Sequence, residues 1–139
     1  MATKVRDIMT GSPTSVSPEL DIVTVARAMR DEDIGAVLVA DSDTLYGLVT
    51  DRDLVVRGLA AGDDPRQTKV AGVCSDVTAT VGPDDSLDTA ADRMRERSVR
   101  RLPVIENGRP IGIVSLGDLA IAEGAQSALA DISAAKGNT

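Results

Sequence analysis

Apolar residues follow two different spacings in the first part of the chain. After Asp21, a candidate N-cap, they recur every three to four positions, which predicts one face of an amphipathic helix. Two apolar runs follow, at residues 36–40 and 45–49, and the polar turn between them predicts a pair of strands. An extended piece at residues 15–16 and a second helix from Asp51 complete a strand–helix–strand–strand–helix unit. The positions that share the first helical face are Ile22, Val25, Ala26 and Met29.

The second part of the chain repeats this order of elements. Residues 5–54 align with residues 70–119 without a gap, and identities recur along the whole alignment. The repeated helical face consists of Leu87, Ala90, Ala91 and Met94, with Ser86 as its candidate N-cap. The extended piece, the two strands and the second helix are expected at residues 80–81, at 102–105, at 111–114 and from Leu116. The identical pairs include Val5/Val70, Met29/Met94, Gly47/Gly112 and Asp53/Asp118.

The repeat divides the chain into four parts. We expect a first copy at residues 4–61, a linker at 62–69, a second copy at 70–122 and an Ala-rich, partly disordered tail at 123–139. One copy of this length buries too little apolar surface to be stable alone. Two copies packed sheet to sheet around one aliphatic core are therefore the expected architecture.

Composition narrows the chemistry that the chain can perform. The hydrophobic fraction of 42% and the charged fraction of 27% are those of a soluble globular protein, and Tyr46 is the only aromatic residue. The formal net charge of −7 argues against nucleic acid as a partner, because nucleic-acid binding relies on clustered cations. No apolar run is long enough to span a bilayer, so we expect a cytoplasmic protein with no membrane partner.

The sequence has no His and a single Cys, Cys74. The commonest general base and the commonest transition-metal ligand are therefore missing, and no thiolate-rich zinc cluster can form. We expect no metal site and no enzyme activity. We also expect Cys74 to be a small buried apolar residue rather than a reactive thiol.

The most informative motif comes where the second strand of each copy runs into a helix. In the pattern Gly-hydrophobic-Val-(Thr/Ser)-x-x-Asp, Thr50 and Asp53 of the first copy correspond to Ser115 and Asp118 of the second. The pattern is typical of a capping box, in which a hydroxyl and a carboxylate accept hydrogen bonds from free backbone N–H groups. It also suits a nucleotide site, with the hydroxyl and the helix N–H groups on a phosphate and the Asp on ribose hydroxyls. The spacing alone leaves both interpretations open.

Arginines crowd the segment that leads into the first strand of the second copy. Arg93 is expected on a solvated helix face. Arg100 and Arg101 enter a strand that we expect to be buried, where an unpaired cation is costly and an anionic partner would offset the cost. The corresponding residues of the first copy, Gly35 and Ala36, need no such partner.

The tandem unit and both motifs resemble a pair of CBS domains (cystathionine β-synthase motifs), also called a Bateman module. The resemblance covers about residues 4–122 and rests on the repeat, the order of elements, the Thr50–Asp53 pattern and the Arg-Arg-Leu-Pro-Val segment at residues 100–104. The spacing is also similar to stand-alone CBS-pair proteins of actinobacteria, including the hypoxic-response type. The resemblance implies an α/β (α+β) fold: two βαββα repeats related by a pseudo-twofold axis, forming one Bateman module.

The resemblance also implies a ligand and its contacts. Such pairs sense adenosine compounds, for example AMP, ADP, ATP or S-adenosylmethionine, in clefts between the repeats, and no cofactor is required. In the implied first site, Thr50 meets phosphate, Asp53 meets ribose, Arg52, Arg100 and Arg101 supply charge, and the Ala79 backbone approaches the base. In the implied second site, Ser115 and Asp118 take the matching roles, with Thr14 near the base.

Two departures from the family pattern affect these expectations. Arg100 and Arg101 stand where the family often has His-Arg, which keeps the charge but changes the shape. The second site has no cation at Gly35 or Ala36, so we expect it to bind more weakly or to prefer a less charged adenosyl ligand.

The expected function is that of a non-catalytic ligand sensor. It would signal to an unknown effector protein or through its oligomer state, with a homodimer implied by the resemblance. The alternative is a ligand-free structural dimer or protein-interaction module of a stress response. Candidate dimer contacts are Leu54, Val55 and Leu59 of the second helix.

Overall fold

The two compact units of the structure divide the chain differently from the two sequence copies. The computed structural model describes residues 3–42 and 44–124. One unit, the middle unit, consists of Thr14–Asp76, and the other, the split unit, joins Met1–Pro13 to Val77–Thr139. Each unit therefore contains the first residues of the opposite sequence copy. The expected tail lies, from residue 125 onward, outside the described residues.

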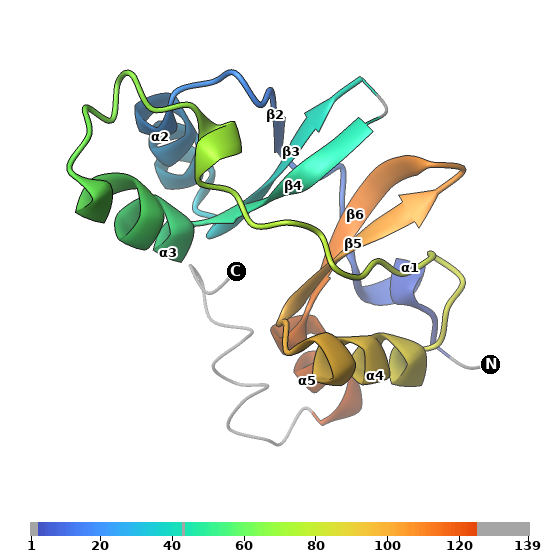
Figure 1. The fold of residues 1–139 in the computed structure, drawn as a ribbon. Coiled ribbons are helices and arrows are strands. Elements are labelled where there is room, and N and C mark those ends of the chain that lie inside the picture. The colour runs from blue at the N-terminus through green and yellow to red at the C-terminus, as the bar shows by residue number, and fades with distance from the viewer. Residues whose placement is uncertain (1–2, 43, 125–139) are drawn as a thin grey trace. The chain divides into compact units, whose positions relative to one another are not determined.

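The middle unit contains a three-stranded sheet and its helices (Figure 1). Its elements are β2 (Ser15–Val16), α2 (Ile22–Glu32), β3 (Ala36–Asp41), β4 (Thr44–Thr50), α3 (Asp51–Asp53), η1 (Leu54–Gly58), η2 (Leu59–Ala61) and η3 (Val70–Gly72). The strand order is β2-β3-β4, with β2 parallel to β3 and β3 antiparallel to β4. The short α3 leads directly into η1, a π-helical turn, and then into η2, a 3-10 turn.

The split unit contains a second three-stranded sheet, in the order β1-β6-β5. Its elements are α1 (Val5–Ile8), β1 (Thr10–Gly11), α4 (Leu87–Arg97), β5 (Arg101–Glu106), β6 (Arg109–Ser115) and α5 (Leu116–Glu123). Both strand pairs of this sheet are antiparallel. The predicted strand pairs and second helices of both copies are confirmed, but the extended piece at residues 80–81 is reduced to a single parallel bridge between Val81 and Val104.

The longest helix of each unit begins at its predicted cap. A carboxylate oxygen of Asp21 accepts a hydrogen bond from the Thr24 N–H at 3.0 Å, and the Ser86 hydroxyl accepts one from the Thr89 N–H at 3.1 Å. The buried positions of the predicted α2 face are Ile22, Val25 and Met29. Ala26 lies on the same face but is exposed, and it lines an open apolar groove together with Ile22 and Met29.

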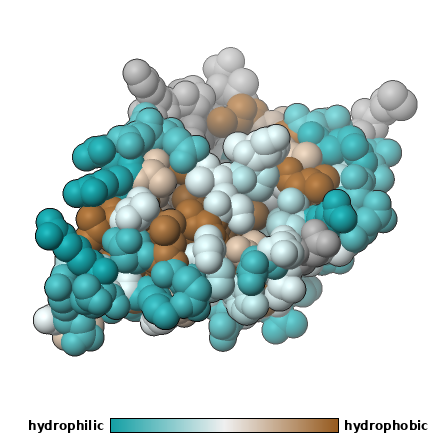
Figure 2. Space-filling model, turned by 90° about the horizontal axis from the view of Figure 1, so that it is seen from above, coloured by the Kyte–Doolittle hydropathy of each residue, from teal (hydrophilic) through white to brown (hydrophobic). Residues whose placement is uncertain are grey.

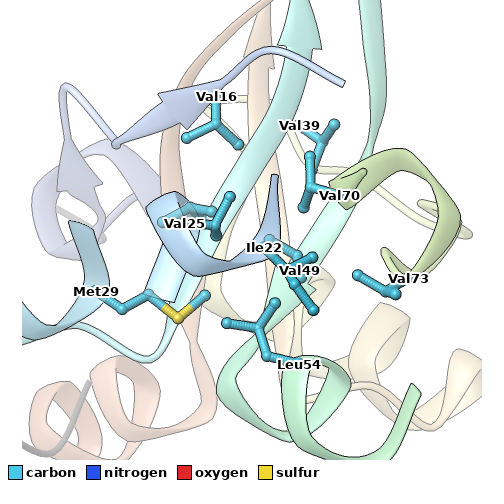
Figure 3. Close-up of a cluster of buried hydrophobic side chains, with 10 residues drawn as sticks. Val16, Ile22, Val25, Met29, Val39, Val49, Leu54, Val70 and Val73 are labelled. Atoms are coloured by element: carbon cyan, nitrogen blue, oxygen red, sulfur yellow. The ribbon is translucent and has the colours of Figure 1, made fainter. Parts of the chain in front are cut away.

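Each unit has its own cluster of buried aliphatic side chains. In the middle unit, side chains from α2, β3, β4 and η1 meet Val70 and Val73, which follow the linker (Figure 3). In the split unit, Val5 of α1 is completely buried among side chains of α4, β5, β6 and α5. The first residues of each sequence copy thus complete the core of the opposite unit, and their burial stabilises that exchange. The sequence suggested one core shared by the copies, whereas the buried side chains form one cluster in each unit.

The glycine that opens each strand-to-helix motif lies at a close backbone crossing. Ser75 pairs with Leu48 of β4, and a Cβ on Gly47 would lie 2.6 Å from the Ser75 carbonyl oxygen. β1 pairs with β6 in the same way, and a Cβ on Gly112 would lie 2.9 Å from the Thr10 carbonyl oxygen. Both distances are too short for a side chain, so the motif requires glycine because another segment passes close to it.

Exposed hydrophobic residues are few on the surface of the described residues. On the face shown in Figure 2, hydrophobic residues form small groups among hydrophilic ones. The exposed large hydrophobic side chains are Tyr46, Val55, Val56, Leu59, Leu116 and Ile121. Val55 and Leu59 line an apolar groove of about 330 Å³ together with side chains of α2. Of the helices in the described ranges, none combines the length and the hydropathy needed to cross a membrane.

Candidate functional site

Thr50 and Asp53 form a capping box where β4 runs into α3. The Asp53 N–H donates to the Thr50 hydroxyl at 3.2 Å, and the Thr50 N–H donates to Oδ2 of Asp53 at 3.0 Å. The turn brings the two side chains together because Thr50 keeps extended backbone angles while the next residue, Asp51, begins the helix. Asp53 is only 8% exposed and is the one buried charged residue among those described. The capping interpretation is therefore confirmed for the first copy.

Two further side chains of the middle unit approach the Asp53 carboxylate. The Ser75 hydroxyl donates to Oδ1 and Oδ2, each at 3.3 Å, and Nε of Arg57 lies 3.9 Å from Oδ1. Both carboxylate oxygens therefore have protein partners. Neither residue is predicted from the sequence to be part of the site. Arg57 could have been found, because an Asp and an Arg four residues apart on a helix form a common ion pair, whereas Ser75 lies 22 residues from Asp53 and carries no local signal.

Ser115 and Asp118 form the same box where β6 runs into α5. The Asp118 N–H donates to the Ser115 hydroxyl at 3.1 Å, and the Ser115 N–H donates to Oδ2 of Asp118 at 2.8 Å. Asp118 is half-buried, and in the described part of the chain its carboxylate accepts this one hydrogen bond. The two boxes thus share their geometry but differ in what else holds the carboxylate.

The cations predicted to face a ligand lie in two different environments. Arg100 is exposed and precedes β5, which begins at Arg101, so the prediction that Arg100 enters a buried strand is wrong. Its backbone carbonyl accepts a hydrogen bond from the Leu116 N–H at 2.8 Å, which holds the residue in the loop between α4 and β5. Arg101 is half-buried, lies opposite Ser115 in the sheet and has an interaction of its own. Arg52 is exposed on α3.

Arg93 lies on the helix face that we expect to be solvated, and its side chain is 42% exposed, but it also has protein partners. Its Nη1 donates to the Thr80 carbonyl at 2.7 Å and lies 3.3 Å from Oδ2 of Asp85. These contacts hold the segment before α4 against the helix. That segment follows Ala79, whose backbone the resemblance places near a base.

Thr14 and Ala79 occupy equivalent places before the first extended piece of each copy. The Thr14 hydroxyl donates to Oε1 of Glu32 at 2.6 Å, and its carbonyl accepts from the Leu38 N–H at 3.0 Å. Ala79 is half-buried and packs against the core of the split unit. The predicted site residues are therefore divided between the units. Thr14, Thr50, Arg52 and Asp53 belong to the middle unit, and Ala79, Arg100, Arg101, Ser115 and Asp118 belong to the split unit.

Cys74 lies in an environment that disfavours its thiolate. It is half-buried and packs against the core of the middle unit. Burial raises the pKa of the Cys74 thiol, and the nearby Asp76 carboxylate adds to the increase. A raised pKa leaves little thiolate at neutral pH, in agreement with the expected packing role.

Curated relatives match nearly the whole chain. CBS domain-containing protein YhcV of Bacillus subtilis is 39% identical over 133 residues, which cover 93% of this chain and 94% of that protein. Hypoxic response protein 1 of Mycobacterium tuberculosis is 40% identical over 119 residues, which cover 85% of this chain and 83% of that protein.

Solved structures have the same fold. The crystal structure of Hypoxic Response Protein I with two coordinated zinc ions matches with a TM-score of 0.76 at 39% identity, over 85% of this chain and 97% of that chain. The CBS domain pair of protein MJ0100, in complex with 5′-methylthioadenosine and S-adenosyl-L-methionine, matches with a TM-score of 0.80 over 91% of this chain and 100% of that chain. At 22% identity, this second match concerns the fold alone.

The residues of this chain do not fit the zinc ions of that relative. The chain has no His and only Cys74 as a thiol ligand. Residues 3–42 and 44–124 contain no group of three or more His, Cys, Asp or Glu side chains that could hold a metal ion. Zinc prefers imidazole and thiolate ligands, and a single thiol does not make up such a ligand set.

Both sequence copies match one family. The CBS domain matches at residues 5–58 and again at residues 70–124, which include both strand-to-helix motifs. CBS pairs are generally regulatory modules. With two such domains, relatives that align over most of their length and solved CBS pairs of the same fold, the chain belongs to the CBS-domain family and forms a single Bateman module.

Proposed function

We propose that this protein is a non-catalytic regulatory module that binds an adenosine-containing ligand, such as AMP, ADP, ATP or S-adenosylmethionine. The observation that carries the proposal is the pair of boxes in which Asp53 and Asp118 stand beside a hydroxyl at a strand-to-helix turn. A carboxylate there can accept hydrogen bonds from both hydroxyls of a ribose. The neighbouring hydroxyl and N–H groups can donate to phosphate. Binding then passes to an effector protein or changes the oligomer state.

The remaining predicted contacts complete the proposed sites. Arg100 and Arg101 supply positive charge to a phosphate, and Arg52 supplies it from α3. The Ala79 backbone meets the base in one site and Thr14 meets it in the other. The fold itself supports this choice of ligand, since the CBS pair of MJ0100 holds two adenosyl compounds.

Thermal unfolding tests the proposal. The midpoint is measured with and without millimolar AMP, ADP, ATP and S-adenosylmethionine. A ligand that binds only the native state at a hundredfold excess over Kd stabilises it by about 2.7 kcal/mol, which raises the midpoint by several degrees. The Asp53→Asn and Asp118→Asn variants, which keep a capping oxygen, should each lose part of this rise. No rise with any of the four compounds would contradict the proposal, and turnover of a nucleotide would contradict its non-catalytic part.

A second candidate function is a ligand-free homodimer module, and one observation favours it. Val55 and Leu59 are 56% and 59% exposed beside the apolar groove of the middle unit. Exposed aliphatic side chains that rim such a groove are typical of an interaction surface. We propose a second copy of this chain as the partner there, and this homodimer is compatible with either function.

A further inference from the structure

The two boxes hold their carboxylates differently. Asp53 has a side chain that is only 11% exposed, and its two oxygens accept hydrogen bonds from the Thr50 N–H and from the Ser75 hydroxyl. Arg57 adds a positive charge 3.9 Å from Oδ1. Asp118 is half-buried and, among the described residues, keeps only the hydrogen bond from the Ser115 N–H. Within the described residues, the Asp53 carboxylate therefore has more protein partners than the Asp118 carboxylate, whose Oδ1 accepts no hydrogen bond.

The difference has a local cause at the residues that face each carboxylate. Thr10 is the counterpart of Ser75, since each lies beside the strand of its own motif, Thr10 opposite Ile113 and Ser75 opposite Leu48. Thr10 is exposed and makes no hydrogen bond to Asp118 in the described structure. Three residues past the aligned range, the same offset makes Ala122 the counterpart of Arg57, so within the described residues the second box lacks that positive charge.

We propose that Ser75, assisted by Arg57, is a latch that closes Asp53 to ligands, so that Asp118 receives the first adenosine ligand. This inference rests on the proposed function. The Asp53 side chain is only 11% exposed, so a ribose hydroxyl that donates to it competes with the Ser75 hydroxyl for the small accessible part of the carboxylate. The Ser75 backbone is held by two hydrogen bonds to Leu48, at 3.0 and 2.9 Å, so the side chain opens by rotating about its own Cα–Cβ bond. The site of Asp118 then binds the ligand more tightly than the site of Asp53, which is the reverse of the order expected from the charges of Arg100 and Arg101.

Calorimetric titration of AMP tests the latch one box at a time. In the Asp118→Asn background only the box of Asp53 keeps its carboxylate, so the titration measures AMP binding at that box. Ser75→Ala should tighten AMP binding there by roughly tenfold, because it removes a competing hydrogen bond to a charged group. The matched control is Thr10→Ala in the Asp53→Asn background, which should change the affinity of the Asp118 box by less than about twofold. Repeating both titrations with 2′-deoxyadenosine monophosphate should abolish most of the Ser75→Ala gain, because that gain depends on the ribose hydroxyls.

A second variant keeps the test decisive if Ser75→Ala folds poorly. Arg57→Met leaves the Ser75 hydroxyl in place and removes a charge whose side chain is 55% exposed, so adenosine, which carries no phosphate, should bind the Asp53 box a few-fold more tightly. Unchanged or weaker AMP binding in Ser75→Ala, while the Asp118→Asn parent binds AMP, overturns the latch and leaves the proposed function standing. Absence of binding in the wild type and in every variant overturns both.

Discussion

Single residues set how stability depends on pH. The Thr24 hydroxyl and the Thr24 N–H donate hydrogen bonds to the Asp21 carboxylate, and these bonds lower the pKa of Asp21 below its usual range. Arg6 lowers the pKa of Asp84 in the same way, with a hydrogen bond at 2.9 Å. A carboxyl group whose pKa is lower in the folded state contributes stability above its unfolded pKa. That contribution is lost as the pH falls through the folded value.

Acid unfolding should depend on Asp21. We expect the free energy of unfolding to decrease below about pH 4, near the unfolded pKa of an Asp side chain, and Asp21→Asn to make that decrease shallower. Chemical denaturation between pH 7 and pH 3 measures it. Thr24→Val is the companion variant, since it removes the hydroxyl donor but keeps the backbone N–H. Identical pH profiles for Asp21→Asn and the wild type would refute the role of this carboxylate.

At the scale of elements, predictions succeeded where a signal was local. The caps at Asp21 and Ser86 and the strand-to-helix boxes depend on atoms within four residues, so a sequence pattern can identify them. Predictions failed where a neighbouring element decided. Arg93 contacts the segment before α4 because the Thr80 carbonyl lies within its reach, and Arg100 is exposed in the loop that precedes β5, which begins at Arg101.

The crossing at β4 gives a prediction at this scale. Gly47→Ala would place a methyl group 2.6 Å from the Ser75 carbonyl oxygen and 2.9 Å from Sγ of Cys74, so we expect a loss of about 1–3 kcal/mol in the free energy of unfolding. Gly72→Ala is the matched control, because a Cβ there meets no atom within 4 Å and should change stability by about 0.5 kcal/mol or less. Equal stabilities for the two variants, measured by chemical denaturation, would show that the backbone crossing at Gly47 accommodates a methyl group.

At the scale of the whole chain, the exchange of leading segments decides which residues depend on one another. Val5 and Val70 are equivalent in the repeat and are both completely buried, yet each lies in the core of the unit built mainly from the other copy. Removing either side chain should therefore weaken the unit in which it is buried rather than its own sequence copy.

Amide hydrogen exchange can detect which core each leading segment completes. Val5→Ala should cost about 2 kcal/mol and should increase exchange mainly in β5, β6 and α5, whereas Val70→Ala should increase it mainly in α2, β3 and β4. Mass spectrometry of the two variants under native conditions measures the difference. Increased exchange confined to α2, β3 and β4 in Val5→Ala would contradict the division into a middle and a split unit.

The proposed homodimer is tested at the same scale. Leu59→Glu puts a charge beside the apolar groove of the middle unit and should convert a dimer to a monomer in sedimentation velocity, because a buried unpaired carboxylate is costly. Tyr46→Glu is the control: Tyr46 is 50% exposed and is not among the residues that line the groove, so the sedimentation coefficient should stay unchanged. A wild-type monomer, or an equal loss in both variants, would count against this interface.

The sequence by itself determined the repeat, the order of elements, the helix caps, the two boxes and the family, because all of these are encoded in spacing or in contacts between residues close along the chain. Only the tertiary structure decided which core each leading segment completes, why Gly47 and Gly112 must lack a side chain, and that Ser75 reaches Asp53 from 22 residues away. Such contacts join residues that no local pattern links. They follow from burying Val5 and Val70 away from water in the units where they fit.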